Sequence, residues 1–355
     1  MVSGRVAPDP SSPIRTASGS TSRKDRVMRL RLLAVATLLL VAGSALAATT
    51  IPLGGDAPQM RLMRESRAGL SYQLELGSLR AIEVETKGGT FTQLFLPGQY
   101  TSMIEGAPEL PQMNRLIAIP HGADVKVDVR NVQTRTVRLA DHGLAHPVMP
   151  HQPSVSKSAD VDALPFVYDP AAYAVSRVER PLGQAEYVGR LRAMDIARVE
   201  VAPVRYLPAT NELEVVTSCD VEISFTGGDW AATERLIQST YSPFFQPVYH
   251  EVDGIREFNG RSDLVKDPVK MVIVTPAQFE SQLQEYVDWK TERGFEVITG
   301  VIGSPEVGST TSSIQSYLHG LYNEATPDDP APSFVVFIGD VAQCPTWQIS
   351  GDATD

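Results

Sequence analysis

The sequence lacks the residues on which several common classes of protein depend. It has two cysteines among 355 residues and no Cys-x-x-Cys pair, which excludes a disulfide framework and leaves structural zinc and redox motifs without support. Positive charge is also scarce, because 31 Lys and Arg face 42 Asp and Glu and the net charge is -11. This balance disfavours nucleic-acid binding and attachment to anionic lipid. The hydrophobic content of 43% is that of an ordinary globular protein, with room for two domains.

Familiar catalytic motifs are absent as well. The sequence has no His-Glu-x-x-His, no Gly-x-Ser-x-Gly, no P-loop and no dinucleotide-binding glycine pattern after a strand. One pair, Cys344 and His319, has the right chemistry for a thiol nucleophile and its base. We expect His319 on a helix that packs on a sheet face and Cys344 in a loop beyond a strand, which disfavours a hydrogen bond between them. Cys219 alternates within a β pattern and is interpreted as a core residue.

Long hydrophobic runs are missing except for one near the start, Leu32 to Ala42. Arg29 and Arg31 precede this run, and a small-x-small pattern that ends at Ala47 follows it, which is typical of a cleaved secretory signal peptide. About 11 apolar residues are too few to cross a membrane, which needs about 20. We therefore expect residues 1–47 to be an extension plus signal peptide, with Met28 as the true start and cleavage after Ala47. The mature chain is expected outside the cytoplasm, secreted or at the cell surface.

Residues 48–228 alternate between apolar and polar side chains with a period of two, which predicts an all-β, sandwich-like or barrel domain of short antiparallel strands. The segment 142–160, rich in proline and serine, is expected to be a surface loop. Its histidines, His142, His146 and His151, are interpreted as loop residues rather than metal ligands, because no cysteine or carboxylate stands at a ligand-like spacing.

Residues 229–268 are expected to connect two domains. A short helix over 231–238 precedes an aromatic stretch, 241–249, in which Phe244, Phe245 and Tyr249 are too apolar for a free linker and are expected to lie against one domain. The following polar residues, 257–267, are the expected exposed piece.

From Val269 the pattern becomes β-α-β-α-β, which predicts a parallel sheet with right-handed crossovers. The expected strands are 269–274, 295–301 and 334–338. One helix is expected from Pro276 to Gly294 after a cap at Thr275, and a second after a cap at 309–311. The first helix is expected to carry one apolar stripe, formed by Phe279, Leu283, Tyr286, Val287 and Lys290. Ligands of such sheets bind beyond the carboxyl ends of the strands, here Thr275, the 300–308 loop and Asp340. Three strands make an incomplete sheet, so we expect the chain to be truncated at Asp355.

This region resembles the opening of the gingipain-type cysteine peptidases, peptidase family C25. The matching segments are Val269–Pro276 (VKMVIVTP), Tyr286–Gly294 (YVDWKTERG), Ile314–Tyr317, Phe334–Asp340 and Gly351–Asp355. Upstream, three segments resemble that family's pro-domain: Glu105–Pro111 (EGAPELP), Ile117–Pro120 and Val201–Glu214.

The resemblance implies a precursor fragment of a secreted cysteine-type endopeptidase. Residues 48–228 are then an all-β pro-domain, 229–268 a connector, and 269–355 the start of a caspase-like catalytic domain in which a Cys thiolate attacks peptide bonds and a His moves the proton. The family's catalytic His and Cys come from later strand ends, so no catalytic residue is assigned here and the fragment alone is expected to be inactive. The implied partners are peptide substrates and the pro-domain as an intramolecular inhibitor, with no cofactor required.

Processing and metal binding leave alternatives open. Arg261 in the connector is a candidate site for removal of the pro-domain, and a solvated linker charge is an equally good interpretation. Asp340, Asp352 and Asp355 could bind structural calcium, although exposed loop carboxylates explain them more simply. The chain could also be an exported non-catalytic binding or surface-assembly protein, or a sorting transpeptidase of the same family.

Overall fold

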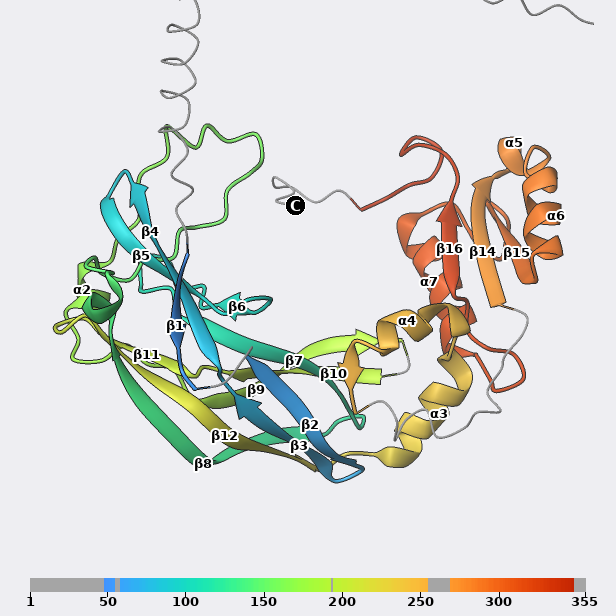
Figure 1. Ribbon diagram of the computed structural model, residues 1–355. Helices are drawn as coiled ribbons and strands as arrows, with labels where there is room; N and C mark the ends of the chain where they lie inside the picture. Colours follow the sequence, from blue (N-terminus) through green and yellow to red (C-terminus); the bar gives the residue numbers. More distant parts are fainter. Residues whose placement is uncertain (1–47, 55–57, 193, 255–268, 348–355) are drawn as a thin grey trace, which may run out of the picture. The chain divides into compact units, whose positions relative to one another are not determined.

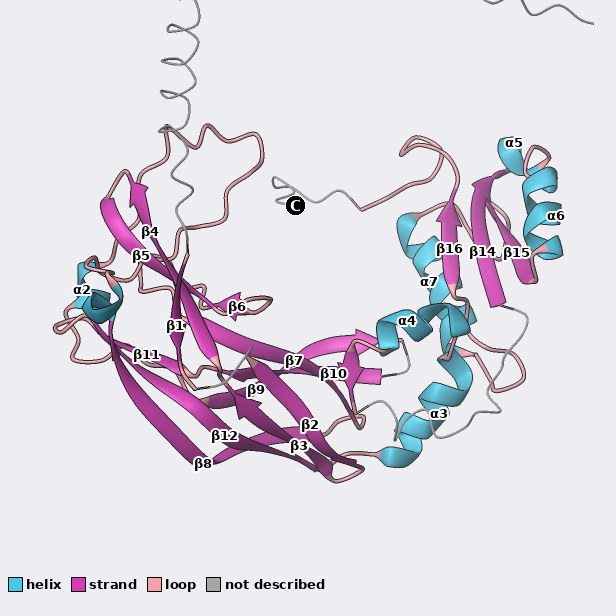
Figure 2. Cartoon of the chain, viewed as in Figure 1, coloured by secondary structure: helices cyan, strands magenta, loops and turns pink. Residues whose placement is uncertain are grey.

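The computed structural model describes residues 48–54, 58–192, 194–254 and 269–347. Antiparallel strands dominate the chain up to residue 254, and helices alternate with parallel strands from residue 269 (Figures 1 and 2). The expected signal peptide, Met28 and Ala47 lie outside the described residues, as do Arg261, Asp352 and Asp355. No helix in the described ranges is both long and apolar enough to cross a membrane.

Three β-sheets build the first part of the chain. The first has the order β1-β4-β5: β1 (Thr49–Pro52), β4 (Ser78–Thr86) and β5 (Gly89–Phe95). The second has the order β13-β7-β10-β9, with β6 also on β7: β6 (Tyr100–Thr101), β7 (Pro111–Ile119), β9 (Gly183–Leu191), β10 (Met194–Val201) and β13 (Val252–Asp253). The third has the order β11-β12-β3-β2, with β8 also on β12: β2 (Gln59–Ser66), β3 (Gly69–Glu75), β8 (Asp124–Arg138), β11 (Val204–Leu207) and β12 (Glu212–Thr226).

One hydrophobic core joins these sheets, as the period-two pattern predicts. It takes Ile51 and Leu94 from the first sheet, Met113 and Val199 from the second, and Val221 from the third, all fully or almost fully buried. The last strand of this region, β12, runs through 15 residues. Two register shifts against β8 let this strand bend along its length.

Residues 229–254, hereafter the bridging segment, carry α3 (Trp230–Thr240), η2 (Pro243–Phe245), α4 (Gln246–Tyr249) and β13. The Asp229 side chain caps α3 by accepting from Ala232 N. Ile237 and Tyr249 pack on Ala118, Met194 and Ile196 of the second sheet in a separate small core. In addition, β13 pairs with β7 in parallel. The bridging segment is thus fastened to the β-sheets by both packing and backbone hydrogen bonds. Two short helices complete the β part: η1 (Leu139–His142) and α2 (Pro170–Tyr173).

The second part of the chain is a three-stranded parallel sheet of order β15-β14-β16: β14 (Val269–Pro276), β15 (Phe295–Ile302) and β16 (Phe334–Phe337). The helix α7 (Thr311–Asn323) packs on the face that carries Val272 and Val274. On the opposite face, Tyr286 of α6 (Gln284–Glu292) reaches Met271, with 3.9 Å between the hydroxyl and the sulfur. Helices therefore cover both faces of β14, which is why this strand is buried from Val269 to Thr275 and its sequence is a near-continuous apolar run.

The single helix expected from Pro276 to Gly294 is wrong, because the structure has two: α5 (Ala277–Glu280) and α6. Thr275 does not cap α5. It is a fully buried residue of β14, and the N-cap position falls on Pro276, which offers no side-chain acceptor. After α5 the amides of Gln282 and Leu283 bond three residues back, which tightens the backbone before α6 begins. The expected apolar stripe is nevertheless confirmed: Phe279, Leu283, Tyr286, Val287 and Lys290 are all less exposed than their neighbours.

Candidate functional site

The carboxyl edge of the parallel sheet is the place where this architecture puts a site. Because β14 is central and its neighbours are reached by crossovers in opposite directions, the strand order reverses there. Beyond β15, Gly303 and Gly308 close a tight loop with a 2.7 Å backbone hydrogen bond. Beyond β16, the Asp340 carboxylate accepts from Val341 N at 2.7 Å and so begins a turn. The edge is built from backbone turns and carries few reactive side chains.

The structure does not bring the Cys344 thiol and His319 into a catalytic pair. Cys344 is 4% exposed in the turn after β16, and burial raises the pKa of its thiol, which disfavours the reactive thiolate. His319 is exposed on α7, and within the described residues no hydrogen bond joins it to the thiol. Cys219 lies in the main core, where burial raises its pKa to about 11. Neither thiol in the chain has the environment of a nucleophile.

The described residues give little support for metal binding. No group of three or more His, Cys, Asp or Glu side chains gathers in the described ranges. His146 pairs with Glu83 at 2.8 Å, and His151 stands 3.9 Å from Glu109, so each has one carboxylate partner. Asp340 is exposed and caps its own turn. The calcium site therefore stays a prediction.

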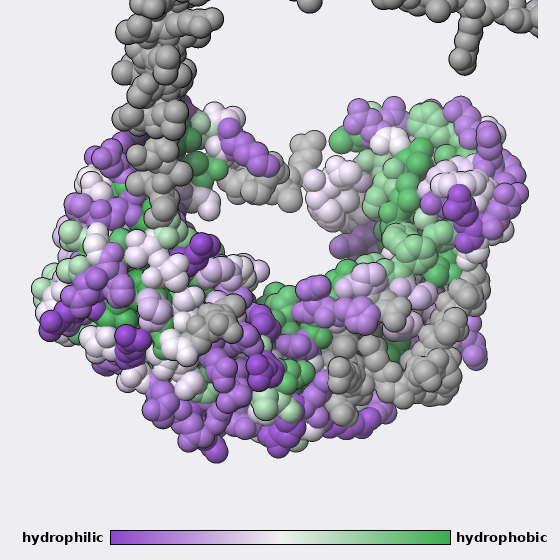
Figure 3. Space-filling model, in the orientation of Figure 1, coloured by the Kyte–Doolittle hydropathy of each residue, from purple (hydrophilic) through white to green (hydrophobic). Residues whose placement is uncertain are grey.

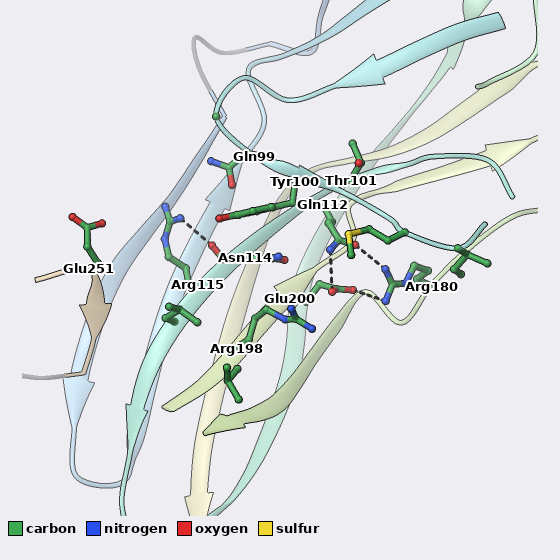
Figure 4. A pocket seen from close by; sticks show the side chains of 15 residues that line it. Gln99, Tyr100, Thr101, Gln112, Asn114, Arg115, Arg180, Arg198, Glu200 and Glu251 are labelled. Atoms are coloured by element: carbon green, nitrogen blue, oxygen red, sulfur yellow. Dashed lines mark hydrogen bonds and ion pairs between the residues drawn. The ribbon is translucent and has the colours of Figure 1, made fainter. Parts of the chain in front are cut away.

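A cavity lies on the second β-sheet, outside the α/β part (Figure 4). It measures about 800 Å³ and is lined by residues of β6, β7, β9 and β10 together with the loop after β6. Exposed apolar side chains stand around it: Tyr100, Met103 and Ile104 are 63%, 76% and 57% exposed. Sequence analysis missed this site, because its residues come from segments that are far apart in sequence, as Gln112 and Glu200 are, at 88 positions from each other.

A buried carboxylate network forms the floor of this cavity. Glu200 is only 4% exposed, and its oxygens accept from Gln112 Nε2 at 3.0 Å and Gln184 Nε2 at 3.0 Å. Arg180 Nη2 lies 2.9 Å from Glu200 Oε1, and Arg180 Nη1 donates to Gln112 Oε1 at 2.7 Å (Figure 4). Every oxygen of the carboxylate thus has a donor, which is what makes a buried charge tolerable. The network is structural, since it leaves no free acid or base for chemistry.

A second buried carboxylate, Asp195, sits at the start of β10. Arg190 Nε donates to it at 2.8 Å, His121 Nδ1 lies 2.8 Å away, and the Tyr187 hydroxyl donates at 3.2 Å. Burial alone would raise the pKa of Asp195, but the hydrogen bonds from Arg190 and His121 outweigh it and hold that pKa below its usual value. Asp195 is consequently ionised in the folded chain at neutral pH.

The bridging segment contacts the parallel sheet through its aromatic residues. Phe244 lies 5.4 Å from Phe295 and 5.2 Å from Phe334, measured between ring centroids, and Phe245 lies 6.2 Å from Phe334. Tyr249 instead is buried against the second β-sheet. Figure 3 shows hydrophobic surface over the part of the chain that holds β14 and β16, and Val335 and Phe337 are 41% and 53% exposed.

Comparison with known families adds independent information. The family model for the C25 propeptide matches residues 52–238, and the model described as peptidase family C25 matches residues 265–355. Lys-gingipain of Porphyromonas gingivalis is 34% identical over 314 residues, which is 88% of this chain and 18% of that protein. Gingipain R2 of the same species is 24% identical over 303 residues, covering 85% of this chain and 40% of that protein. The chain therefore spans about a fifth of the length of the Lys-gingipain that it matches.

Two solved structures are similar to the chain. A structure on the zymogenic latency of gingipain K from Porphyromonas gingivalis is 34% identical, covers 51% of this chain and 100% of that one, and superposes with a TM-score of 0.49. A complex of RgpB pro- and mature domains from that species is 22% identical, covers 56% of this chain and 97% of that one, and has a TM-score of 0.44.

Proposed function

The chain belongs to peptidase family C25, and we propose that it is the N-terminal part of the precursor of a secreted cysteine endopeptidase. The observation that carries this proposal is the succession of the family's propeptide, matched at 52–238, and its peptidase domain, matched from 265. Most strands of the first three β-sheets lie within the propeptide match, and the three strands of the parallel sheet lie within the peptidase match. We assign the β part as the pro-domain and the α/β part as the opening of a caspase-like catalytic domain.

In the proposed mechanism, a Cys thiolate attacks the peptide carbonyl and a His transfers the proton to the leaving amine. Both catalytic residues lie beyond Asp355 in this proposal. The environments of Cys344 and His319 support it, since one is a buried thiol with a raised pKa and the other is an exposed helix residue without a thiol partner in the described residues. The chain as it stands supplies the scaffold of the site, and no cofactor is required.

The β part acts as an intramolecular inhibitor in this proposal. A tethered domain has an effective concentration of roughly millimolar, so a micromolar affinity for the active site leaves about a thousandth of the enzyme open. A cut in the segment 255–268 removes the tether and with it the high effective concentration of the inhibitor. Arg261 is our candidate for the site of this cut. Export by a signal peptide that ends at Ala47 would place the enzyme outside the cell, where proteins and peptides are its substrates.

The test uses the matured full-length gene product on peptide substrates, with and without iodoacetamide. We expect cleavage that the alkylator abolishes, and we expect Cys344→Ser to cleave as well as the parent enzyme, since that thiol is not the nucleophile. N-terminal sequencing of the matured protein locates the cut and checks Arg261. Absence of cleavage after confirmed processing would refute the peptidase and favour an exported binding protein.

A further inference from the structure

Arg192 follows β9 and precedes β10, and its backbone is in an unfavourable conformation. Arg192 has φ 50, in the left-handed region, where a side chain with a Cβ is disfavoured and glycine or asparagine is the usual choice. Backbone strain of this kind persists only when contacts elsewhere over-determine it.

The guanidinium of Arg192 supplies those contacts. Its Nε donates to the Thr240 carbonyl at 2.9 Å, at the end of α3, where the helix carries partial negative charge. Its Nη1 donates to the Pro332 carbonyl at 3.2 Å, just before β16, and its Cζ stands 4.8 Å from the centre of the Phe245 ring. The same side chain therefore bonds the bridging segment and the parallel-sheet part at once. Tyr322 of α7 completes the contact by donating to the Arg192 carbonyl at 3.4 Å.

Because the Arg192 side chain is partly buried, its docking contact depends on the two carbonyl groups that accept its hydrogen bonds. Desolvation lowers the pKa of Arg192, and its Nη2 is buried without a hydrogen-bond partner among the described residues. An arginine held away from water needs the two carbonyls that it has, because losing either leaves another donor unpaired. The position is thus suited to a fixed docking contact rather than to a solvated surface charge.

Other contacts surround Arg192 and join the same two parts. Ala331 N donates to Ser239 O at 2.8 Å, and Ser333 Oγ donates to Ser242 Oγ at 2.7 Å. The Phe244 and Phe245 rings lie against Phe334. None of these residues falls within 255–268, so a cut in that segment breaks none of these contacts.

We propose that Arg192 is the docking anchor of the β part on the peptidase domain, and that it holds the two together after the chain between them is cut. The proposal rests on the proposed function only in naming these parts a pro-domain and a peptidase domain. The strained backbone at Arg192 serves the interface and not the β part. Loss of the Arg192 side chain is therefore predicted to weaken docking. Relief of the backbone strain at this position is predicted to stabilise the β part.

The experiment uses the chain from Ala48 with a recognition sequence for a site-specific protease inserted near Arg261. After nicking, gel filtration over a dilution series gives the dissociation constant of the two pieces, and urea unfolding followed by tryptophan fluorescence gives the stability of the β piece. We expect Arg192→Ala to raise the dissociation constant at least ~10-fold, since hydrogen bonds from a charged donor are lost. Arg192→Gly should weaken docking as much, yet raise the folding equilibrium constant of the β piece about twofold to fivefold.

Two matched variants serve as controls. Arg198→Ala removes an exposed arginine of β10 that pairs with Glu186 at 2.6 Å, and it should leave docking unchanged. Asn131→Gly changes another left-handed residue, in β8 with φ 52, away from the interface, and should leave docking unchanged. Unchanged docking in Arg192→Ala, or equal losses of docking and β-piece stability in Arg192→Gly, would overturn the proposal. These readouts need no peptidase activity, so they stand or fall separately from thiol-sensitive cleavage by the full-length enzyme.

Discussion

Removal of the Glu200 carboxylate should destabilise the β part severely, although Glu200 has no catalytic role. The change Glu200→Ala deletes three donor contacts, from Gln112, Gln184 and Arg180, and leaves those donors without their acceptor. Breaking a buried ion pair costs about 3–5 kcal/mol. Because the Arg180 side chain is 26% exposed, water reaches it in part, and we expect about 3 kcal/mol. For a domain of this size that loss lowers Tm by about 6–12 °C.

The assay is urea unfolding followed by the fluorescence of Trp230, which packs against the small core of the bridging segment. The other two tryptophans, Trp289 and Trp347, are 45% and 64% exposed and are replaced by phenylalanine in every variant. The midpoint should fall with an unchanged slope, because the change affects stability and not the surface exposed on unfolding. Glu186→Ala is the matched control: this glutamate of β9 pairs with Arg198 but is exposed, so its loss should cost under about 1 kcal/mol. A loss below 1 kcal/mol in Glu200→Ala would refute the reasoning about the buried network.

Four further predictions follow from single contacts. The pKa of Asp195 is depressed, so its contribution to stability is present above about pH 4 and is lost as the pH falls through the folded-state pKa. The variant Asp195→Asn lacks this group, and its Tm should therefore fall less between about pH 4 and 2 than the Tm of the parent chain. Gly69→Ala should prevent folding, since the added Cβ would lie 1.9 Å from a backbone oxygen of β12. The control Gly89→Ala places its Cβ in open space and should cost only about 1 kcal/mol. Thermal melting followed by circular dichroism distinguishes the two variants. Tyr249→Phe should stabilise the chain by about 1 kcal/mol in urea unfolding, because its buried hydroxyl has no partner among the described residues. Cys344 should react with iodoacetamide far more slowly in the folded chain than in urea, and equal rates would contradict its burial.

Local periodicity predicted a large share of the secondary structure. The strands at 295 and 334, the apolar stripe of α6 and the Thr310 cap of α7 are confirmed, because each depends on residues within one turn or one strand. The break between α5 and α6 was not predicted, since it depends on Thr275 being fixed in the sheet rather than free to cap a helix.

The candidate site depends on contacts between residues far apart in sequence, which limits how much of it the sequence can predict. The expectation that Tyr249 lies against one domain is confirmed. Its attachment to the second sheet, and that of β13, could not be predicted, because Ala118 and the partner residues of β13 in β7 are far away in sequence. The same holds for the cavity above Glu200 and for Arg192, whose role is visible only once Thr240 and Pro332 are placed beside it. The identity of a family, in contrast, was accessible from short motifs, which need no knowledge of their partners in space.

The place of β12 in its sheet has a consequence for how the chain folds during synthesis. β12 pairs along one edge with β8 over residues 212–226, and along the other with β11 and then β3, whose residues lie about 150 positions earlier. The central strand of this sheet is therefore also its last to be made. Until residue 226 has left the ribosome, β3 and β8 lack the strand that joins them, and the core that they share cannot close. Formation of these distant contacts should make folding slow, and the edges of β3 and β8 that pair with β12 stay unpaired until then.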